Sequence, residues 1–242
     1  MTIVFEELDY QSTVLGDISL RRRSEPKIDN TIVYEVKLGD EFLMSSLFTA
    51  AEVELARLGL AGLEGDGLDV VVGGLGLGYT AAAALESSAV RSLVVIEYLQ
   101  PVIEWHRSGL VPLGKALNSD DRCSLVHGDF FIAAGAPGGS FSVVDPPRKM
   151  HAVLLDIDHA PAHWLAPGNG EFYTAASLGH LAEKIHSGGI FGMWSNDPPD
   201  KDFCRLLESV FQSSEAHVVS FPNPYSGGES SSTVYIARKS TV

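Results

Sequence analysis

The sequence has few cysteines, few basic residues and no long apolar run. Cys123 and Cys204 are its two cysteines, which excludes a disulfide framework or a cysteine-based zinc site. Lys and Arg number 17 against 31 Asp and Glu, and the net charge of −14 argues against nucleic-acid binding, because phosphate backbones attract basic side chains. No apolar run reaches the roughly 18 residues of a membrane span, and the first residues do not resemble a secretory signal. We therefore expect a cytoplasmic protein without nucleic-acid or membrane partners.

The first 46 residues favour a small antiparallel β unit. Residues 31–38 alternate apolar and polar side chains, as half-buried strands do. Gly16-Asp17 and Gly39-Asp40 are turn signals between short extended pieces. The basic run at residues 21–23 is interpreted as a solvated strand edge.

A helix is expected next, because apolar residues recur at helical spacing after residue 46. Thr49 is positioned to cap its start, and Gly62 ends it. We predict a first domain of residues 1–62, made of the β unit and this helix, and a second domain of residues 63–242.

From residue 68 onward, apolar strand patterns alternate with helical patterns. The predicted strands are residues 68–72, 92–97, 123–126, 152–157 and 189–194, and the predicted helices are residues 80–85, 100–108, 172–185 and 201–211. Continuous apolar strands are typical of a parallel sheet covered on both faces. The final strands, 216–221 and 233–237, have too short a connection for a parallel pair. The pattern predicts an α/β, doubly wound, mostly parallel seven-stranded Rossmann-like sheet behind a small antiparallel β unit.

A glycine-rich loop at residues 73–78 joins the first of these strands to its helix. Glu97 ends the next strand about 20 residues later, a spacing at which an acid accepts hydrogen bonds from ribose hydroxyls. Glycines allow close approach of the backbone to a ligand, so we predict a nucleoside site at Gly74, Gly76, Gly78 and Glu97. Because Gly76-x-Gly78-x-x-Ala81 also fits the dinucleotide pattern, an NAD-binding oxidoreductase is one alternative.

With the β unit in front, the chain resembles the spermidine synthase (aminopropyltransferase) family, within the S-adenosylmethionine-dependent methyltransferase fold. The family's glycine loop, ribose-binding acid, adenine-contacting Asp and catalytic Asp match residues 73–78, Glu97, Asp129 and Asp156. Its Phe-Tyr helix start and its Pro-rich entry to the last strand match Phe172-Tyr173 and residues 221–225.

The resemblance implies a sulfonium donor, S-adenosylmethionine or its decarboxylated form, and a homodimer. The implied cofactor-binding residues are Gly74, Gly76, Gly78, Glu97, Asp129 and Phe130. Asp129 suits an adenine amine in a site for one nucleoside, which weighs against NAD. Asp156, at the carboxyl end of a parallel strand, is the candidate catalytic residue that orients or deprotonates an acceptor; its structural alternative is a cap of the next turn.

The chain departs from the family at three places. Gly76 replaces the Asp that receives the free amine of the decarboxylated donor, and Ala50 and Glu52 occupy the Tyr and Glu of the polyamine motif. His159 stands where a second strand-end Asp is usual, with Asp158 one residue early. Because Gly76 leaves room for an intact carboxylate, methyl transfer to a small-molecule acceptor is slightly favoured. Aminopropyl transfer to a polyamine is the alternative, and a non-catalytic nucleoside-binding protein is a further one.

The candidate substrate-binding residues are Glu52, Asp158, His159, Ser195 and Asn196. Asp158, His159 and His163 fit no usual zinc spacing, so no metal is expected. The segment at 195–196 follows the fifth strand at the same sheet edge, where it caps a helix, faces the cleft or does both. Residues 44–46 either roof the cleft or pack ordinarily.

Overall fold

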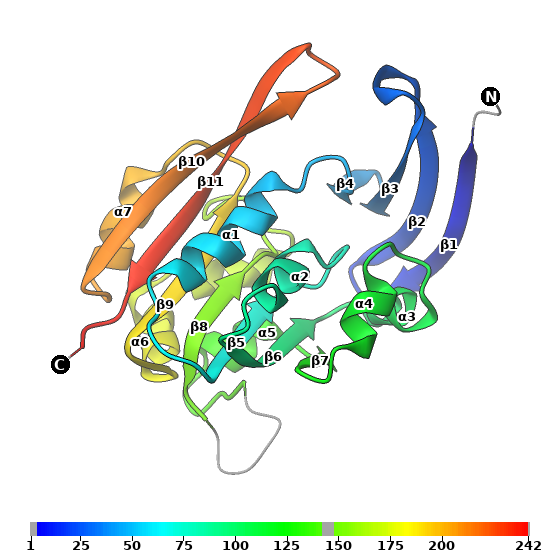
Figure 1. The fold of residues 1–242 in the computed structure, drawn as a ribbon. Helices are drawn as coiled ribbons and strands as arrows, with labels where there is room; N and C mark the ends of the chain where they lie inside the picture. The colour runs from blue at the N-terminus through cyan, green and yellow to red at the C-terminus, as the bar shows by residue number, and fades with distance from the viewer. Residues whose placement is uncertain (1–3, 142–147, 242) are drawn as a thin grey trace.

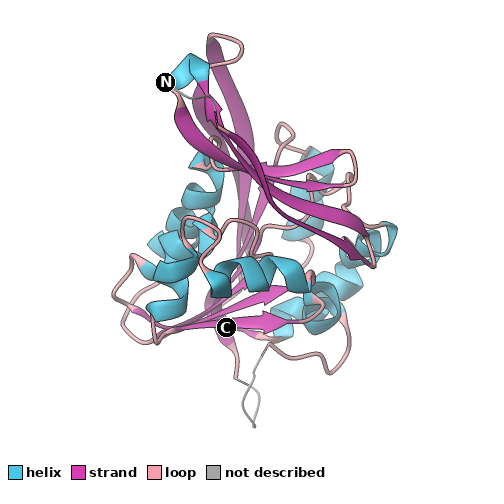
Figure 2. Ribbon diagram, turned by 90° about the vertical axis from the view of Figure 1, so that its right-hand side faces the viewer, coloured by secondary structure: helices cyan, strands magenta, loops and turns pink. Residues whose placement is uncertain are grey.

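The computed structural model describes residues 4–141 and 148–241, which form two sheets connected by a helix (Figure 1). The N-terminal sheet has the order β1-β2-β3-β4 with antiparallel neighbours. Its strands are β1 (Phe5–Thr13), β2 (Gly16–Glu25), β3 (Thr31–Leu38) and β4 (Glu41–Ser45). Gly16 already pairs with Thr13, so the first turn lies at Val14-Leu15, before the predicted Gly16-Asp17. In Figure 2 this sheet lies toward the viewer and crosses the upper part of the molecule, with the N-terminus at its upper left.

The large sheet has seven strands in the order β10-β11-β9-β8-β5-β6-β7. They are β5 (Leu68–Gly73), β6 (Val90–Glu97), β7 (Cys123–His127), β8 (Met150–Leu155), β9 (Ile185–Ser195), β10 (Ser213–Asn223) and β11 (Gly228–Arg238). The strands from β9 to β7 are parallel, while β11 pairs antiparallel with both β9 and β10. The predicted fold class and the antiparallel final pair are confirmed.

Helices cover both faces of this sheet. They are α1 (Ala50–Ala61), α2 (Tyr79–Leu85), α3 (Gln100–Ser108), α4 (Gly114–Ser119), α5 (Phe130–Gly135), α6 (Ala175–Glu183) and α7 (Lys201–Glu208), with 3₁₀ turns η1 (Pro26–Ile28) and η2 (Pro167–Phe172). In Figure 1, α1 lies in front of the sheet and α6 behind it. No helix in residues 4–141 or 148–241 is long and apolar enough to cross a membrane.

The predicted helices differ from the structure in several places, and those expected at 172–185 and 201–211 end early, at Glu183 and Glu208. The helix expected at residues 172–185 starts only at Ala175, because η2 precedes it and the Thr174 hydroxyl caps the new start by accepting from Ser177 N. The helices α4 and α5 were not predicted. Thr49 does occupy the cap position of α1, but its side chain makes no capping hydrogen bond.

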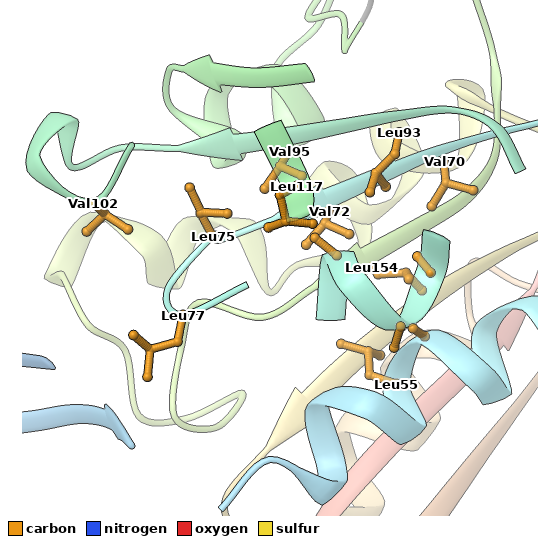
Figure 3. Packing of buried hydrophobic residues seen from close by; sticks show 14 of the residues in the cluster. Leu55, Val70, Val72, Leu75, Leu77, Leu93, Val95, Val102, Leu117 and Leu154 are labelled. Atoms are coloured by element: carbon orange, nitrogen blue, oxygen red, sulfur yellow. The ribbon is translucent and has the colours of Figure 1, made fainter. Parts of the chain in front are cut away.

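The core is divided by the large sheet into two clusters, because successive strand residues point to opposite faces. Val70 and Val72 of β5 pack in the cluster beneath α1, with Leu55 and Leu154 (Figure 3). Val71 packs in the cluster on the other face. The helix α1 also contacts α2 and strands β8 to β11, so it is packed on the large sheet. The division of the chain at residue 62 stays a prediction.

Candidate functional site

A cavity of about 1060 Å³ lies at the carboxyl ends of the parallel strands, the edge where open α/β sheets bind ligands. β4, the start of α1 and the β10–β11 turn contribute to its walls. The structure brings these predicted residues to the lining: Glu52, Gly74, Gly76, Glu97, Asp129, Phe130, Asp156, His159 and Asn196. Gly78, Asp158 and Ser195 are not part of it.

The glycine loop is packed too closely for side chains. Gly74 has φ +93°, and a Cβ there would overlap the carbonyl oxygen of Asp156. Gly76 has φ +47°, and its Cβ would overlap the thioether end of Met44 from β4. The N-terminal sheet therefore rests on the loop at the position where a side chain would otherwise project. Gly78 caps α2 and packs against Leu117 and His106.

Glu97 holds the loop from the end of β6. Its Oε2 accepts from Leu75 N at 2.9 Å and its Oε1 from Leu99 N at 2.7 Å. Burial raises the pKa of Glu97, while these backbone N–H groups oppose the rise. The N–H groups of Gly76 and Tyr98 also hydrogen-bond this carboxylate, so it lies at the cavity wall as an acceptor ordered by four backbone groups.

Two further acids, from different elements, line the cavity. Asp156 follows β8, and its Oδ2 accepts from the Thr80 hydroxyl at 2.6 Å, while the same hydroxyl lies 3.3 Å from the backbone oxygen of Glu52. Burial raises the pKa of both carboxyls, and the charge on Asp156 raises that of Glu52 further. Both shifts favour the protonated forms of the pair, and a cation placed beside the two carboxyls would favour loss of a proton. Thr80, which the sequence interpretation missed, is the side chain that fixes Asp156.

Asp129 and Phe130 begin α5 at the end of β7. The Asp129 Oδ1 caps this helix by accepting from Ile132 N at 3.1 Å. Phe130 is buried in an aromatic cluster with Phe141, at 5.7 Å between ring centroids, and Phe172, at 6.0 Å. This end of the cavity has an apolar wall beside one partly exposed carboxyl.

Asp158 and Ser195 hold loops rather than face the cavity. Asp158 is 1 % exposed, and its oxygens accept from Leu165 N at 2.8 Å, Asn169 Nδ2 at 2.7 Å and the Tyr173 hydroxyl at 2.6 Å. Ser195 is fully buried, and its hydroxyl accepts from Asp197 N. These contacts fix the segments that follow β8 and β9.

His159 and Asn196 line the cavity mouth together. The Asn196 backbone N donates to the His159 carbonyl at 2.7 Å, and the His159 Nε2 lies 3.0 Å from Glu41 Oε1 of β4. This contact joins the loop after β8 to the N-terminal sheet. In the parts of the chain that the structure describes, no three His, Cys, Asp or Glu side chains are grouped to hold a metal ion.

The interpretation of residues 21–23 as a solvated edge is wrong for Arg21 and Arg23. β2 is an inner strand, and both guanidinium groups pair with Glu35 of β3. Arg23 lines the cavity and donates to the Tyr225 hydroxyl at 2.6 Å. The sequence does place two arginines on one strand and a glutamate on the next. Which of them pair could be known only from the register of the two strands.

His106 of α3 contacts the glycine loop. It is fully buried, and its Nε2 is 2.9 Å from the Gly76 carbonyl oxygen. Burial lowers its pKa, which favours the neutral ring donating Nε2–H to that carbonyl. The ring therefore contacts the glycine loop at Gly78, while Met44 contacts it at Gly76.

Comparison with known proteins identifies the architecture. No protein-family model matches the chain. A spermidine synthase crystallised with the transition state analogue AdoDATO superposes with a TM-score of 0.73 at 17% identity, over 98% of this chain and 74% of the other. The fold is that of spermidine synthase. A second spermidine synthase, from Thermotoga maritima, superposes with a TM-score of 0.70 at 16% identity, over 98% of this chain and 73% of the other. The resemblance to the spermidine synthase fold is thereby confirmed, and at these identities it speaks for the fold alone.

Proposed function

We propose that this chain transfers a carbon group from an S-adenosylmethionine-type sulfonium donor to an amine. The observation that carries the proposal is the Glu52–Asp156 pair, which faces the same cavity as the backbone-held Glu97. Glu97 would bind the ribose hydroxyls, and Asp129 and Phe130 would bind the adenine. A buried acid pair that retains a proton is suited to seat an ammonium and take a proton from it.

Because the sulfonium is already an activated leaving group, the main task of the protein would be to align the amine with the carbon that is transferred. The amine lone pair attacks the carbon next to the sulfonium, and the carbon–sulfur bond breaks with its electrons moving to sulfur, which leaves a neutral thioether. The proton lost from nitrogen passes to Asp156, which Thr80 holds in place. The cavity would hold the two reactants in a fixed orientation.

Aminopropyl transfer is the reaction that the fold comparisons favour over the methyl transfer favoured from the sequence. One structural neighbour is a spermidine synthase that binds the transition state analogue AdoDATO. This similarity supports a decarboxylated donor for the present chain. Methyl transfer remains the second candidate, because Gly76 offers no carboxylate to a free donor amine. The space that the sequence led us to expect beside Gly76 is filled by the Met44 side chain.

The test is a product assay. The protein is incubated with either donor and an amine, and the nucleoside products are separated by mass spectrometry. Methylthioadenosine reports aminopropyl transfer, and S-adenosylhomocysteine reports methyl transfer. If neither forms with any amine while calorimetry shows donor binding, the non-catalytic alternative replaces this proposal. Micromolar NAD binding without donor binding would contradict the donor class as well.

Glu97→Ala should weaken donor binding about tenfold or more, because hydrogen bonds to a charged group contribute roughly 1.5 to 3 kcal/mol each. Calorimetric titration with S-adenosylhomocysteine and methylthioadenosine measures the change. Glu104→Ala is the matched control, since Glu104 is exposed on α3 and bonds only its neighbours on that helix. Equal affinity of Glu97→Ala and wild type would remove Glu97 from the donor site.

Gly76→Asp combined with Met44→Ala should shift donor preference toward the decarboxylated form by at least about tenfold. A carboxylate about 4 Å from the donor amine contributes roughly 4 kcal/mol before desolvation, and Asp tolerates the left-handed backbone better than most residues. Met44→Ala provides the space that the Cβ needs. We expect wild type to bind intact S-adenosylmethionine at least as well as its decarboxylated form.

Binding of both donors to wild type, Met44→Ala and the double variant is measured by calorimetry. Met44→Ala alone should leave the ratio of the two affinities unchanged. A clear wild-type preference for the decarboxylated donor would show that another acid, with Glu52 the first to test, holds the amine.

A further inference from the structure

Two carboxyls line the acceptor half of the cavity, which is the part at Glu52 and Asp156. Glu52 belongs to the first turn of α1, and Asp156 follows β8. The two groups are chemically alike, and burial raises the pKa of each. Which of them carries a proton therefore depends on the hydrogen-bond donors around them.

These donors are unequally distributed. The Thr80 hydroxyl has one hydrogen, and its oxygen lies 2.6 Å from Asp156 Oδ2 and 3.3 Å from the backbone oxygen of Glu52. The shorter contact has the length of a hydrogen bond to a charged oxygen, so the hydrogen points to Asp156. In the described part of the chain, the donor to the Glu52 carboxyl is the N–H of its own residue.

The position of Thr80 preserves this asymmetry. Thr80 is the second residue of α2 and is 2% exposed, at the contact between α2 and α1. A hydroxyl buried there is shielded from water, and a carboxylate is the strongest acceptor within its reach. Because the hydroxyl occupies Asp156 Oδ2, Oδ1 is the oxygen left to take a proton from a ligand.

Other titratable groups do not disturb the pair equally. Tyr79 of α2 interacts with the Glu52 charge, but burial raises the pKa of its phenol above 10, so it stays neutral near pH 7. His159 and Glu41 lie at the cavity mouth and pair with each other. The Thr80 hydroxyl, in contrast, lowers the pKa of Asp156 directly.

We infer that Thr80 is a positioning residue that divides the acid pair, so that Asp156 is the ionised member and Glu52 is the member that holds the proton. The inference rests on the amine transfer proposed above, because it gives the two acids different tasks in that reaction. As an N–H bond of the ammonium breaks, an O–H bond forms at Asp156 Oδ1, and the electron pair stays on nitrogen for the attack on carbon. Glu52 remains neutral, and its carbonyl oxygen accepts a second N–H.

The test is a carboxyl titration that needs no substrate. The protein is labelled with ¹³C at the side-chain carboxyls of Asp and Glu, and NMR follows each carbon from pH 5 to pH 9. Signals missing from Asp156→Asn and from Glu52→Gln identify the two acids. In wild type we expect Asp156 to lose its proton at least about one pH unit below Glu52.

Thr80→Val keeps the shape of the side chain but removes the hydroxyl. The Asp156 titration should rise by at least about one pH unit, because a hydrogen bond to the charged form is lost. Thr80→Ser keeps a hydroxyl and should stay within about half a unit of wild type. Thr233→Val is the matched control: Thr233 is 1% exposed, and its hydroxyl donates to the Asp197 backbone oxygen at 2.7 Å, outside the cavity lining.

Kinetics give a second readout that a merely structural role would not move. Thr80→Val should have about tenfold lower kcat/KM than wild type at pH 7 and should approach wild type at pH 9, where Asp156 ionises without help. Circular dichroism checks the folding of each variant. If Thr80→Val does not fold, the order of the two titrations in wild type decides alone.

The outcomes separate the inference from the function on which it rests. If Glu52 loses its proton first in wild type, or if Thr80→Val leaves the Asp156 titration in place, the inference is wrong and amine transfer still stands. The expected titrations without transfer to any amine would support the division of the pair and overturn the proposed function.

Discussion

Asp156→Asn is expected to lower turnover by about 10² to 10⁴, the usual contribution of a general base, with donor affinity unchanged within about twofold. The substitution keeps the shape of the side chain and an oxygen that can accept from Thr80, but removes the charge and the basicity. Steady-state kinetics with the best acceptor, together with calorimetry of the donor, measures both quantities. Full turnover in the variant would return Asp156 to a structural role.

Stability gives a second readout of the same variant. Burial raises the pKa of Asp156 and Glu52, so the folded state favours their protonated forms. The stability that these protons provide is complete below the unfolded pKa values of about 4 and is lost as pH rises through the folded values. Removing one acid should also lower the pKa of Glu52, which the Asp156 charge now raises. We therefore expect Asp156→Asn to melt no lower than wild type at pH 8.

Asp158→Asn is the matched control, because Asp158 accepts three hydrogen bonds within the protein. In the variant, an amide NH₂ replaces one of the two oxygens that accept these hydrogen bonds, so at least one of them is lost. We expect Asp158→Asn to lower the free energy of unfolding by about 1 to 3 kcal/mol. If Asp158→Asn is destabilised and Asp156→Asn is not, Asp158 has a structural role and Asp156 is free for a functional one. Thermal melts at pH 5 and pH 8 test this contrast.

Gly74→Ala is expected to lower the free energy of unfolding by about 3 kcal/mol or more and to abolish donor binding. The alanine Cβ would overlap the Asp156 carbonyl, a backbone atom that cannot move aside, and a φ of +93° disfavours any side chain. Urea unfolding and donor calorimetry measure the two effects.

Gly39→Ala isolates the cost of the backbone conformation. Gly39 lies in the β3–β4 turn with φ +56°, and a Cβ there would meet nothing within 4 Å. We expect it to lose about 1 to 2 kcal/mol. If Gly74→Ala costs no more than Gly39→Ala, the close contact between the glycine loop and the end of β8 does not constrain the site.

Local patterns were enough to bring the glycine loop and Glu97 to one edge of the sheet, while their role in donor binding stays a prediction. The apolar run at β5, the glycine loop and Glu97 lie within one strand–helix–strand unit, so their spacing is enough to bring them together. Helices α4 and α5 were missed because six residues make less than two turns, too few for a helical period to show.

The acceptor half depends on contacts between distant elements, which spacing does not encode. Asp156 and Asp158 both follow β8, and their sequence could not tell which one faces the cavity. The answer comes from the three donors around Asp158 and from Thr80 beside Asp156. Similarly, the role of Arg23 depends on Glu35 in the next strand and on Tyr225 at the other end of the chain.

The contact between Arg23 and Tyr225 spans 202 positions of sequence, and the strand after it, β11, inserts between β9 and β10. Closing so long a loop is entropically costly, and contacts of this range slow folding. During synthesis, the contact between Arg23 of the N-terminal sheet and Tyr225 can form only after the β10–β11 turn has left the ribosome. A nascent chain that has completed the glycine loop at residues 73–78 therefore still lacks the Tyr225 contact that joins the N-terminal sheet to the end of the large sheet.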